Sequence, residues 1–550
     1  MLRNCLLFII VFLGGNLLAQ DPPEVVFGPP FDFPLTLSGN FGEIRANHFH
    51  GGLDFKTDGV SGKKVLALAD GYISRVRVTH GSGYVLDVTY DTGYWTINRH
   101  LSGFVAPIAG RVEALQYEQE SWEVEIVPEP GEYPVRKGEQ IAWSGNTGYS
   151  FGPHLHLDMF ESATDDYIDP LPFFMKRIRD TKPPRADAYM LWAYPGEGVV
   201  DGRQGPKSYP VDQKKNIEAW GKIAAGIKAF DYMDQTSNKY GVHTVILSVD
   251  GQEVFRSVVD RFSQYENRMI NSWAYSGYMK SFKDPGNTLR MLHPANEERG
   301  WVTIDEERDY KFEYILKDRY GNTARYTFVV RGKKQPIPSL RYKDKHIFTW
   351  DRVNYLHDLG MSLIIPKGLL YDNVYLNYQL RGEADDVAFT YQLHDQTVYL
   401  HDYCDLSIGL RNMPVADSTK YYVARVYGKG RMSSVGGSYE NGFMHARIRE
   451  LGTYTVALDT IPPEVTAVEP GSWAKKGEIA FRVRERETGI ASYRGTIDGE
   501  YAIFGLEIMT NKLICVPDPE RVKKGEKHEV EITVTDRCGN VTVARETFTW

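Results

Sequence analysis

Five residues in the first third of the sequence carry side chains that can bind a metal or move a proton. They are His50, Asp54, His100, His154 and His156. His50 and Asp54 stand four positions apart in His-Gly-Gly-Leu-Asp, and His154 and His156 stand two apart in His-Leu-His. Residues i and i+2 of a strand face the same side, so His154 and His156 can converge on one point. Neutral imidazole together with carboxylate suits Zn²⁺.

The number of candidate ligands favours a catalytic metal over a structural one. His50, Asp54 and His156 can supply three ligands, which leaves one position of a tetrahedral zinc open for water. Such a zinc polarises a carbonyl and brings the pKa of water near neutrality. His154 and His100 are then candidates to take up the proton and steady the developing charge. For any single histidine near a carboxylate, the alternative is an ordinary polar pair.

The elements that must position these residues are strands. Residues 65–78 have the pattern of a strand, an Asp-Gly turn and a second strand, and residues 84–90 and 94–98 flank another turn at 91–93. Stretches with a helical period are scarce. We therefore predict a mostly antiparallel β domain over residues 21–178.

Five segments within residues 39–160 resemble the LytM/lysostaphin-type zinc endopeptidases, which cut peptide cross-links in bacterial cell walls. The matching segments are Asn-His-Phe-His-Gly-Gly-Leu-Asp at 47–54 and the stretches at 67–73, 99–102, 135–142 and 144–156. The resemblance covers less than a quarter of the chain. A thermolysin-type site is excluded, because the sequence has no His-Glu-x-x-His motif.

The resemblance implies a role for each of the five residues. In that family the residues matching His50, Asp54 and His156 bind zinc, and those matching His154 and His100 assist the water and the tetrahedral intermediate. All five types are present here. Family members that only regulate other hydrolases typically lose some of them, so the intact set implies an active zinc metalloendopeptidase.

The sequence departs from the family pattern in two places. Asn98 stands where the family often has tyrosine, two residues before the histidine of the third segment. Between Ser102 and Val135 the chain is also longer than the minimal family pattern. We expect this insert to wall or gate the substrate groove. His48 matches no ligand and is expected at the surface or beside the ligands, while His80 is expected in a turn.

The predicted function is hydrolysis of the peptide cross-links of peptidoglycan. One alternative is a non-catalytic scaffold that binds the wall or activates another hydrolase. Another is a peptidase that acts on extracellular proteins. The net charge of −8 argues against nucleic acid as a partner. The C-terminal β domains are expected to position the enzyme at the wall or to dock an envelope protein.

The rest of the chain contains an internal repeat. Asp180-Thr-Lys-Pro-Pro recurs as Asp459-Thr-Ile-Pro-Pro, and Asp318-Arg-Tyr-Gly-Asn recurs as Asp536-Arg-Cys-Gly-Asn. Two related Ig-like β-sandwich modules explain this pattern. The expected organisation is a signal peptide at 1–20, a LytM-type peptidase domain at 21–178, an Ig-like sandwich with an insertion at 180–332, a β-rich domain at 333–458 and a second Ig-like sandwich at 459–550. The predicted fold class is mostly β.

Two features of the first repeat have competing interpretations. The aromatic cluster at 262–278 is expected to fill a core, and the alternative is stacking on sugar rings. Asp231 and Asp234 could bind calcium in a loop of the sandwich, but a solvated turn is the expectation.

The N-terminus resembles a secretory signal. A short basic region at 1–4 precedes an apolar run at 5–13, which is too short to span a bilayer comfortably. Cleavage is expected after Ala19 or Gln20, and the alternative is a membrane anchor. The mature chain is expected to have no membrane span and to be periplasmic or extracellular.

Cysteine usage points away from a disulfide framework. Cleavage would leave Cys404, Cys515 and Cys538. Cys515 and Cys538 lie in one predicted module, and the sequence leaves open whether they pair. None has zinc-finger spacing, so a metal must be held by His and Asp.

Overall fold

The protein is mostly β, as the sequence predicts. The computed structural model describes residues 25–212, 216–339 and 346–550. These residues form nine sheets, two of them with ten and eleven strands, that are almost entirely antiparallel, and they form few helices. The predicted signal peptide at 1–20 lies outside the described residues. Within them, no helix combines the length and the apolar character needed to cross a membrane.

The five candidate residues lie on or beside one large antiparallel sheet. Its strand order is β1–β4–β13–β8–β7–β6–β10. These strands are, in that order, Leu37–Gly39, Gly52–Lys56, His154–Glu161, Tyr94–Leu101, Gly83–Tyr90, Gly71–Thr79 and Val124–Ile126. In β13, Leu155, Leu157 and Met159 are buried at alternate positions. The two histidines of β13 therefore lie on the opposite face, away from this core.

A second, three-stranded sheet shares the same hydrophobic core. It consists of β5 (Lys64–Leu66), β12 (Gln140–Trp143) and β9 (Gly103–Phe104). The predicted turn at 70–71 does separate two strands, but β5 and β6 belong to different sheets and form no hairpin. The predicted turn at 91–93 joins β7 to β8.

The insert between Ser102 and Val135 contains a helix that the sequence patterns did not indicate. α1 spans Ala106–Glu118 and buries Ile108, Val112 and Gln116, which recur every four residues on one face. Only two of these three are apolar. The third, Gln116, is polar and can be buried because its side chain donates to the backbone of the following loop. The helical period is therefore weak in the sequence, although it is plain in the structure.

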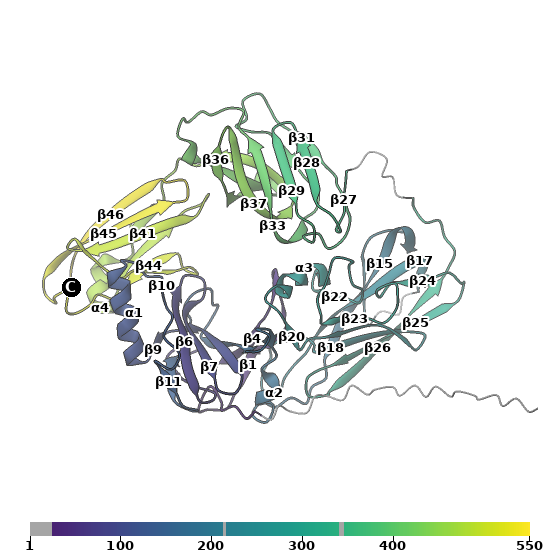
Figure 1. Ribbon diagram of the computed structural model, residues 1–550, viewed down its shortest axis with the longest axis horizontal. Helices are drawn as coiled ribbons and strands as arrows, with labels where there is room; N and C mark the ends of the chain where they lie inside the picture. The colour runs from purple at the N-terminus through teal and green to yellow at the C-terminus, as the bar shows by residue number, and fades with distance from the viewer. Residues whose placement is uncertain (1–24, 213–215, 340–345) are drawn as a thin grey trace, which may run out of the picture.

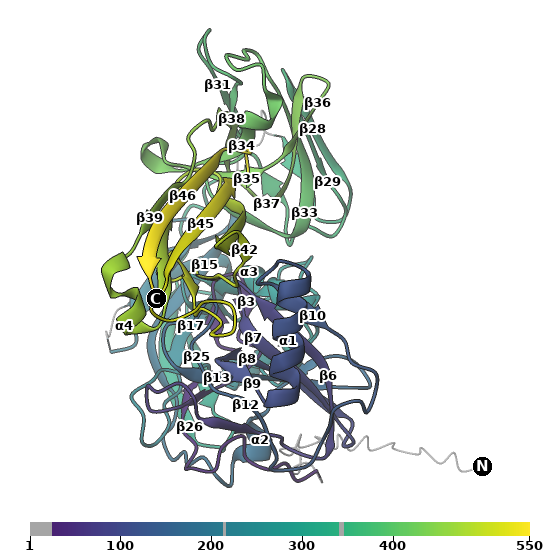
Figure 2. The same ribbon diagram turned by 90° about the vertical axis from the view of Figure 1, so that its left-hand side faces the viewer.

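Four main hydrophobic cores follow one another along the described chain. They draw mostly on residues 27–178, 186–330, 348–456 and 473–548. Figure 1 shows the corresponding β-rich parts arranged as a ring, in which the C-terminal part, in yellow, returns to the side of α1. Figure 2 views the molecule from the side on which α1 and this last part lie.

The repeated sequence motifs close matching hairpins. β25 (Asp309–Lys317) pairs with β26 (Thr323–Gly332), and β45 (Lys527–Asp536) pairs with β46 (Val541–Thr549). At each turn the Asn side chain donates back to the Asp carboxylate, at 2.7 Å in the first repeat and 2.8 Å in the second. The shared motif therefore encodes a shared local structure.

The three cysteines of the described chain are buried and unpaired. Cys515 and Cys538 thus form no disulfide. Burial raises the pKa of the Cys404 and Cys515 thiols to about 12 and that of Cys538 to about 11. Such thiols remain protonated at neutral pH and are poor nucleophiles.

The aromatic cluster of the first repeat packs against the N-terminal part of the chain, residues 25–178. Phe262 and Trp273 are buried, as the core interpretation predicts, and both rings contact Phe49. For Tyr265 and Tyr275 the core interpretation is wrong, because both side chains are exposed. β20 (Arg261–Phe262) also pairs with β14 (Tyr167–Ile168), which extends the large sheet. This insertion therefore forms the contact between the first repeat and the N-terminal part of the chain.

The C-terminal part contacts the N-terminal part through the insert. Trp122 of the insert stacks on His80 with ring centroids 4.9 Å apart, and Tyr493 of the C-terminal part lies 5.6 Å from the same imidazole. Arg494 makes two hydrogen bonds, of 2.8 and 3.0 Å, to the carboxylate of Glu120. These contacts close the ring seen in Figure 1.

We predict that the aromatic contact, rather than the ion pair, holds the ring closed. Gly505 lies so close to Trp122 that a Cβ there would be 2.6 Å from the indole nitrogen. A half-buried aromatic contact of this kind stabilises by up to about 0.5–1.5 kcal/mol beyond its buried area, whereas an exposed ion pair contributes about 0–1 kcal/mol. Trp122→Ala should therefore enlarge the particle in small-angle X-ray scattering, and Arg494→Ala should change it much less. Equal profiles for wild type and Trp122→Ala would contradict this.

Candidate metal centre

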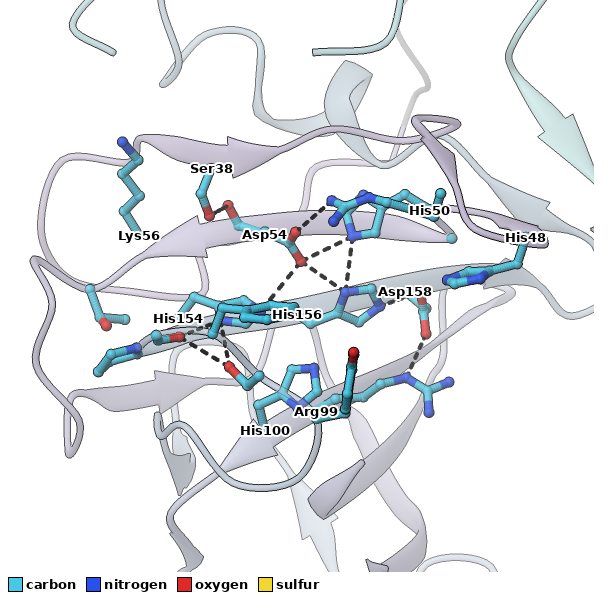
Figure 3. Close-up of a pocket in the computed structure, with 18 of the residues that line it drawn as sticks. Ser38, His48, His50, Asp54, Lys56, Arg99, His100, His154, His156 and Asp158 are labelled. Atoms are coloured by element: carbon cyan, nitrogen blue, oxygen red, sulfur yellow. Dashed lines mark hydrogen bonds and ion pairs between the residues drawn. The ribbon is translucent and has the colours of Figure 1, made fainter. Parts of the chain in front are cut away.

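His50, Asp54 and His156 meet at one point between two neighbouring strands. Asp54 lies in β4 and His156 directly opposite it in β13, while His50 lies just before β4. The nearest ligand atoms are His50 Nε2, Asp54 Oδ1 and His156 Nδ1, and their mutual separations are 3.0, 3.0 and 2.9 Å. Figure 3 shows the three side chains pointing toward one another.

The glycines of the His-Gly-Gly-Leu-Asp segment allow this approach. A Cβ on Gly52 would lie 2.0 Å from the carbonyl oxygen of Leu157 in β13, and one on Gly51 would lie 2.7 Å from Oδ1 of Asp158. Any larger residue would push β4 away from β13. The two glycines therefore set the distance between His50 and His156.

The hydrogen bonds on the outer side of each ring fix which nitrogen carries the proton. His50 Nδ1 lies 2.6 Å from the carbonyl oxygen of Asn40, which can only accept, so Nδ1–H donates to it. His156 Nε2 in the same way donates to Asp158 Oδ1 at 2.7 Å. In the neutral rings, the two inner nitrogens therefore present lone pairs toward Asp54.

Three lone-pair atoms about 3 Å apart repel one another unless a cation lies between them. The described residues place no Lys or Arg at this point: the one guanidinium that reaches Asp54, from Arg45, contacts the other carboxylate oxygen at 3.3 Å. A tetrahedral zinc with bonds of about 2.0–2.2 Å separates its ligand atoms by about 3.3–3.6 Å. The observed donor set needs to open by only a few tenths of an ångström, so it fits this ion in type and in spacing.

The electrostatics of the centre also favour a positive charge within it. Burial alone would raise the pKa of Asp54, but His50 and His156 lower it well below its usual value. Burial alone would lower the pKa of His156, but Asp158 and Asp54 raise it to about 9. A proton therefore occupies the site when no metal does, and metal binding must displace it.

His154 and His100 lie on the open side of the three ligands. His154 Nδ1 donates to the carbonyl oxygen of Gly152 at 2.8 Å, and His100 Nδ1 donates to that of Thr147 at 2.9 Å. Among the described residues, Nε2 of neither ring makes a hydrogen bond, and in His154 this atom faces Asp54 Oδ1 at 3.6 Å. Burial lowers the pKa of His154 and lowers that of His100 to about 4. Both imidazoles are neutral at neutral pH and can accept a proton.

A β-bulge turns His100 toward the site. β8 has two residues, Arg99 and His100, opposite the single residue Val85 of β7. His100 adopts a left-handed backbone conformation with φ of 62°, which is costly for a non-glycine residue. Because of this bulge, two consecutive residues of one strand contribute to one face.

Asn98, where the family often has tyrosine, is buried on the other face and donates to the backbone.

The structure adds a carboxylate that the sequence reasoning missed. Asp158 is almost fully buried, orients His156 and accepts a hydrogen bond of 2.9 Å from Arg99. Burial would raise the pKa of Asp158, but His156 and Arg99 lower it. The signal was present, because residues 154, 156 and 158 share one face of the strand. Asn40 was missed as well, and no spacing in the sequence could reveal its backbone contact with His50.

The five residues line a cavity of about 940 Å³. Its rim includes the exposed aromatic rings of Tyr149 and Phe151, and Asn267 from the first repeat also lines it. The insert at 103–134 contributes no lining residue, so the expectation that it walls or gates this groove is wrong: α1 and its neighbours line a separate cavity against the C-terminal part. His48 lies exposed at the cavity wall, with its ring bonded to the backbone of Ala46.

Comparison with known proteins shows that part of this chain is similar to metallopeptidases. An uncharacterized metalloprotease of Haemophilus influenzae is 33% identical over 133 residues, which are 24% of this chain and 21% of that protein. The glycyl-glycine endopeptidase ALE-1 of Staphylococcus capitis is 29% identical over 153 residues, 27% of this chain and 32% of that protein. The relatives support a LytM-type metallopeptidase domain in this chain. The chain spans only a fifth to a third of the length of these relatives.

A solved structure and a domain family also match parts of this chain. The catalytic domain of the antimicrobial peptidase lysostaphin from Staphylococcus simulans is 25% identical, covers 24% of this chain and 87% of its own length, and has a TM-score of 0.18. Residues 345–459 match the Zu5-like domain family. This match falls on the third predicted unit.

We predict that Asp158→Asn weakens zinc binding by about 10–100-fold, because the loss of an outer-shell partner of a ligating histidine has an effect of that size. The amide removes the charge that holds the Nε2–H of His156. Affinity would be measured by competition with a chromophoric chelator. Glu161→Gln is the matched control, because Glu161 lies in the same strand and pairs with Arg261 outside the cavity. Equal affinities for the two variants would show that Asp158 does not orient the ligand.

Proposed function

We propose that this protein is a zinc metalloendopeptidase that hydrolyses peptide cross-links of bacterial peptidoglycan. The observation that carries the proposal is the convergence of three lone-pair atoms beside two neutral imidazoles whose Nε2 atoms make no hydrogen bond among the described residues. The substrate class is suggested by the ALE-1 relative, whose name describes a glycyl-glycine endopeptidase.

His50, Asp54 and His156 would hold the zinc ion. When bound, Zn²⁺ supplies a Lewis acid that polarises the scissile carbonyl and acidifies a water molecule. The remaining chemistry belongs to the two imidazoles. His154 Nε2 faces the ligand cluster and is the nearer base for the proton of the attacking water. The imidazolium that forms can then donate that proton to the leaving amine.

His100 completes the pair from the opposite side. Its ring centroid lies 5.0 Å from that of His154, so a scissile carbonyl can approach both imidazoles at once. The hydrogen bond from Nδ1 to Thr147 and the bulge at Arg99 hold the ring in place before substrate arrives. A group fixed in this way stabilises developing negative charge without reorganisation during the reaction.

We further propose that the protein is exported and acts in the periplasm or at the cell surface. The N-terminal sequence pattern and the wall substrate support this location. The β-rich parts that follow the peptidase domain would position the cavity at the wall or dock an envelope protein. Their return contact at the insert leaves the metal cavity uncovered, which suits a large substrate.

The direct test is digestion of purified cross-linked peptidoglycan by the zinc-loaded full chain. We expect release of wall peptides that a zinc chelator abolishes and added zinc restores. His154→Ala should lower the rate by at least about 100-fold, the typical contribution of a general base, while it retains one zinc per chain. His48→Ala is the matched control, because His48 lines the same cavity but bonds only to the backbone.

The same assay decides between the proposed function and its rivals. An unfolded protein substrate would be tested in parallel, and its cleavage in place of wall peptides would assign the enzyme to extracellular proteins. Binding to the wall without any chelator-sensitive cleavage would assign a non-catalytic role. A His154→Ala variant with full activity and full zinc would falsify the proposed role of that imidazole.

A further inference from the structure

A second cluster of carboxylates lies where the peptidase part joins the first repeat. Asp180, Asp231 and Asp318 are only 7%, 3% and 4% exposed, and one oxygen from each lies within 4.8 Å of the others. Asp180 precedes β15 (Arg185–Val200), Asp231 directly follows β17 (Ile217–Phe230), and Asp318 directly follows β25. The fold therefore gathers three residues that are far apart in the sequence, and the expected solvated turn at Asp231 is wrong.

These carboxylates have no cationic partner among the described residues. The nearby cations are engaged elsewhere: Arg179 pairs with Asp234, and the Lys182 ammonium donates to the carbonyl oxygen of Met233 at 2.8 Å. Three buried carboxylates without a counter-charge are strongly unfavourable, because burial removes the water that stabilises each charge.

The hydrogen bonds of the cluster are also incomplete. Both oxygens of Asp318 accept from Asn322, and one oxygen of Asp180 accepts from the backbone of Lys182. In contrast, Asp231 Oδ1 and Asp180 Oδ2 are buried and have no hydrogen-bond donor. Two orphaned oxygens that lie in a cluster of like charges are the signature of a missing positive partner.

The second repeat provides an internal comparison. Asp459, Glu485 and Asp536 occupy the corresponding positions and also lie within 4.8 Å of one another. There, Thr488 donates to Asp459, and the backbone of Gly489 donates to Glu485. None of the side-chain oxygens of this second triad is orphaned among the described residues. The orphaned oxygens of the first triad are therefore particular to it and do not follow from the shared fold.

We propose that Asp180, Asp231 and Asp318 bind a Ca²⁺ ion. The ligands are all carboxylate oxygens, which suit a hard cation such as Ca²⁺. The cluster has no imidazole, the ligand that Zn²⁺ prefers. The ligand oxygens lie up to 4.8 Å apart. Two Ca²⁺–oxygen bonds of about 2.3–2.6 Å can span this distance, whereas two Mg²⁺–oxygen bonds of about 2.1 Å span at most about 4.2 Å. This inference is independent of the proposed peptidase function.

A proton is the alternative occupant. Burial and the neighbouring carboxylates raise the pKa of Asp231 to about 8 and that of Asp180 to about 6. Protonation at neutral pH would relieve the repulsion without any metal. The two occupants differ in what happens when Ca²⁺ is added, and this difference is the basis of the test.

The ion would fix a loop that supports the zinc ligands. The backbones of Asp231 and Tyr240 exchange two hydrogen bonds, of 2.9 and 3.0 Å. Tyr240 then donates to the backbone of Leu37 in β1, and Gly241 exchanges two hydrogen bonds with the side chain of Asn40. The carbonyl oxygen of Asn40 in turn holds His50. Residues 231–243 thus connect the carboxylate cluster to the bracing of the metal centre.

The test is equilibrium dialysis of the zinc-loaded full chain against radioactive Ca²⁺, together with hydrogen exchange. Wild type should bind Ca²⁺ saturably, and Ca²⁺ should slow exchange over residues 231–243. Asp231→Asn keeps the shape of the side chain but should lose one Ca²⁺ per chain or bind it at least about tenfold more weakly, because ligand charge sets the affinity. Asp234→Asn is the matched control, since Asp234 pairs with Arg179 and lies outside the triad.

Absence of saturable binding by wild type would overturn the proposal and leave the proton as the occupant. Equal binding by wild type and Asp231→Asn would overturn it as well, since the ion would then lie elsewhere. If Asp231→Asn does not fold, the hydrogen exchange of wild type decides alone, and an unchanged 231–243 segment rejects the site. Zinc content is measured in every sample, so loss of the zinc centre is distinguished from loss of Ca²⁺.

Discussion

The repulsion among three lone-pair atoms organises the functional part of this molecule. His50 Nε2, Asp54 Oδ1 and His156 Nδ1 are held about 3 Å apart, and each imidazole is locked by a hydrogen bond on its outer side. Neither ring can rotate away without breaking that outer bond. The strain is therefore relieved only by a cation, either a proton or a metal ion. This explains why Asp158 and the Asn40 carbonyl are as much a part of the centre as the ligands.

The surrounding parts of the chain brace this centre without covering it. The first repeat contacts the peptidase part through Phe262 and through the loop at 231–243. The C-terminal part contacts it through Gly505 against Trp122 and Tyr493 against His80. All these contacts involve backbone or side chains outside the ligand set. The cavity remains open because the insert packs toward the C-terminal part. Support and access are thus provided by different surfaces.

Much of the fold and of the candidate site could be predicted, but some features could not. The mostly β class follows from alternating patterns, and the structure brings together all five residues that the sequence singled out. Helix α1 was missed because its buried face includes Gln116, which is polar and satisfied by the backbone. Asp158 could have been found from the period of the strand, whereas the backbone contact of Asn40 leaves no trace in residue types.

The sequence by itself determined the chemistry that is available: which side chains can bind a metal, the strand period that aligns His154 and His156, and the glycines that permit close packing. Only the tertiary structure decided which nitrogen of each imidazole faces inward and that His100 turns toward the site. It also decided that Asp180, Asp231 and Asp318 meet without a counter-charge. The reason is physical: local patterns constrain neighbours along the chain, whereas protonation and charge balance depend on partners that only folding brings close.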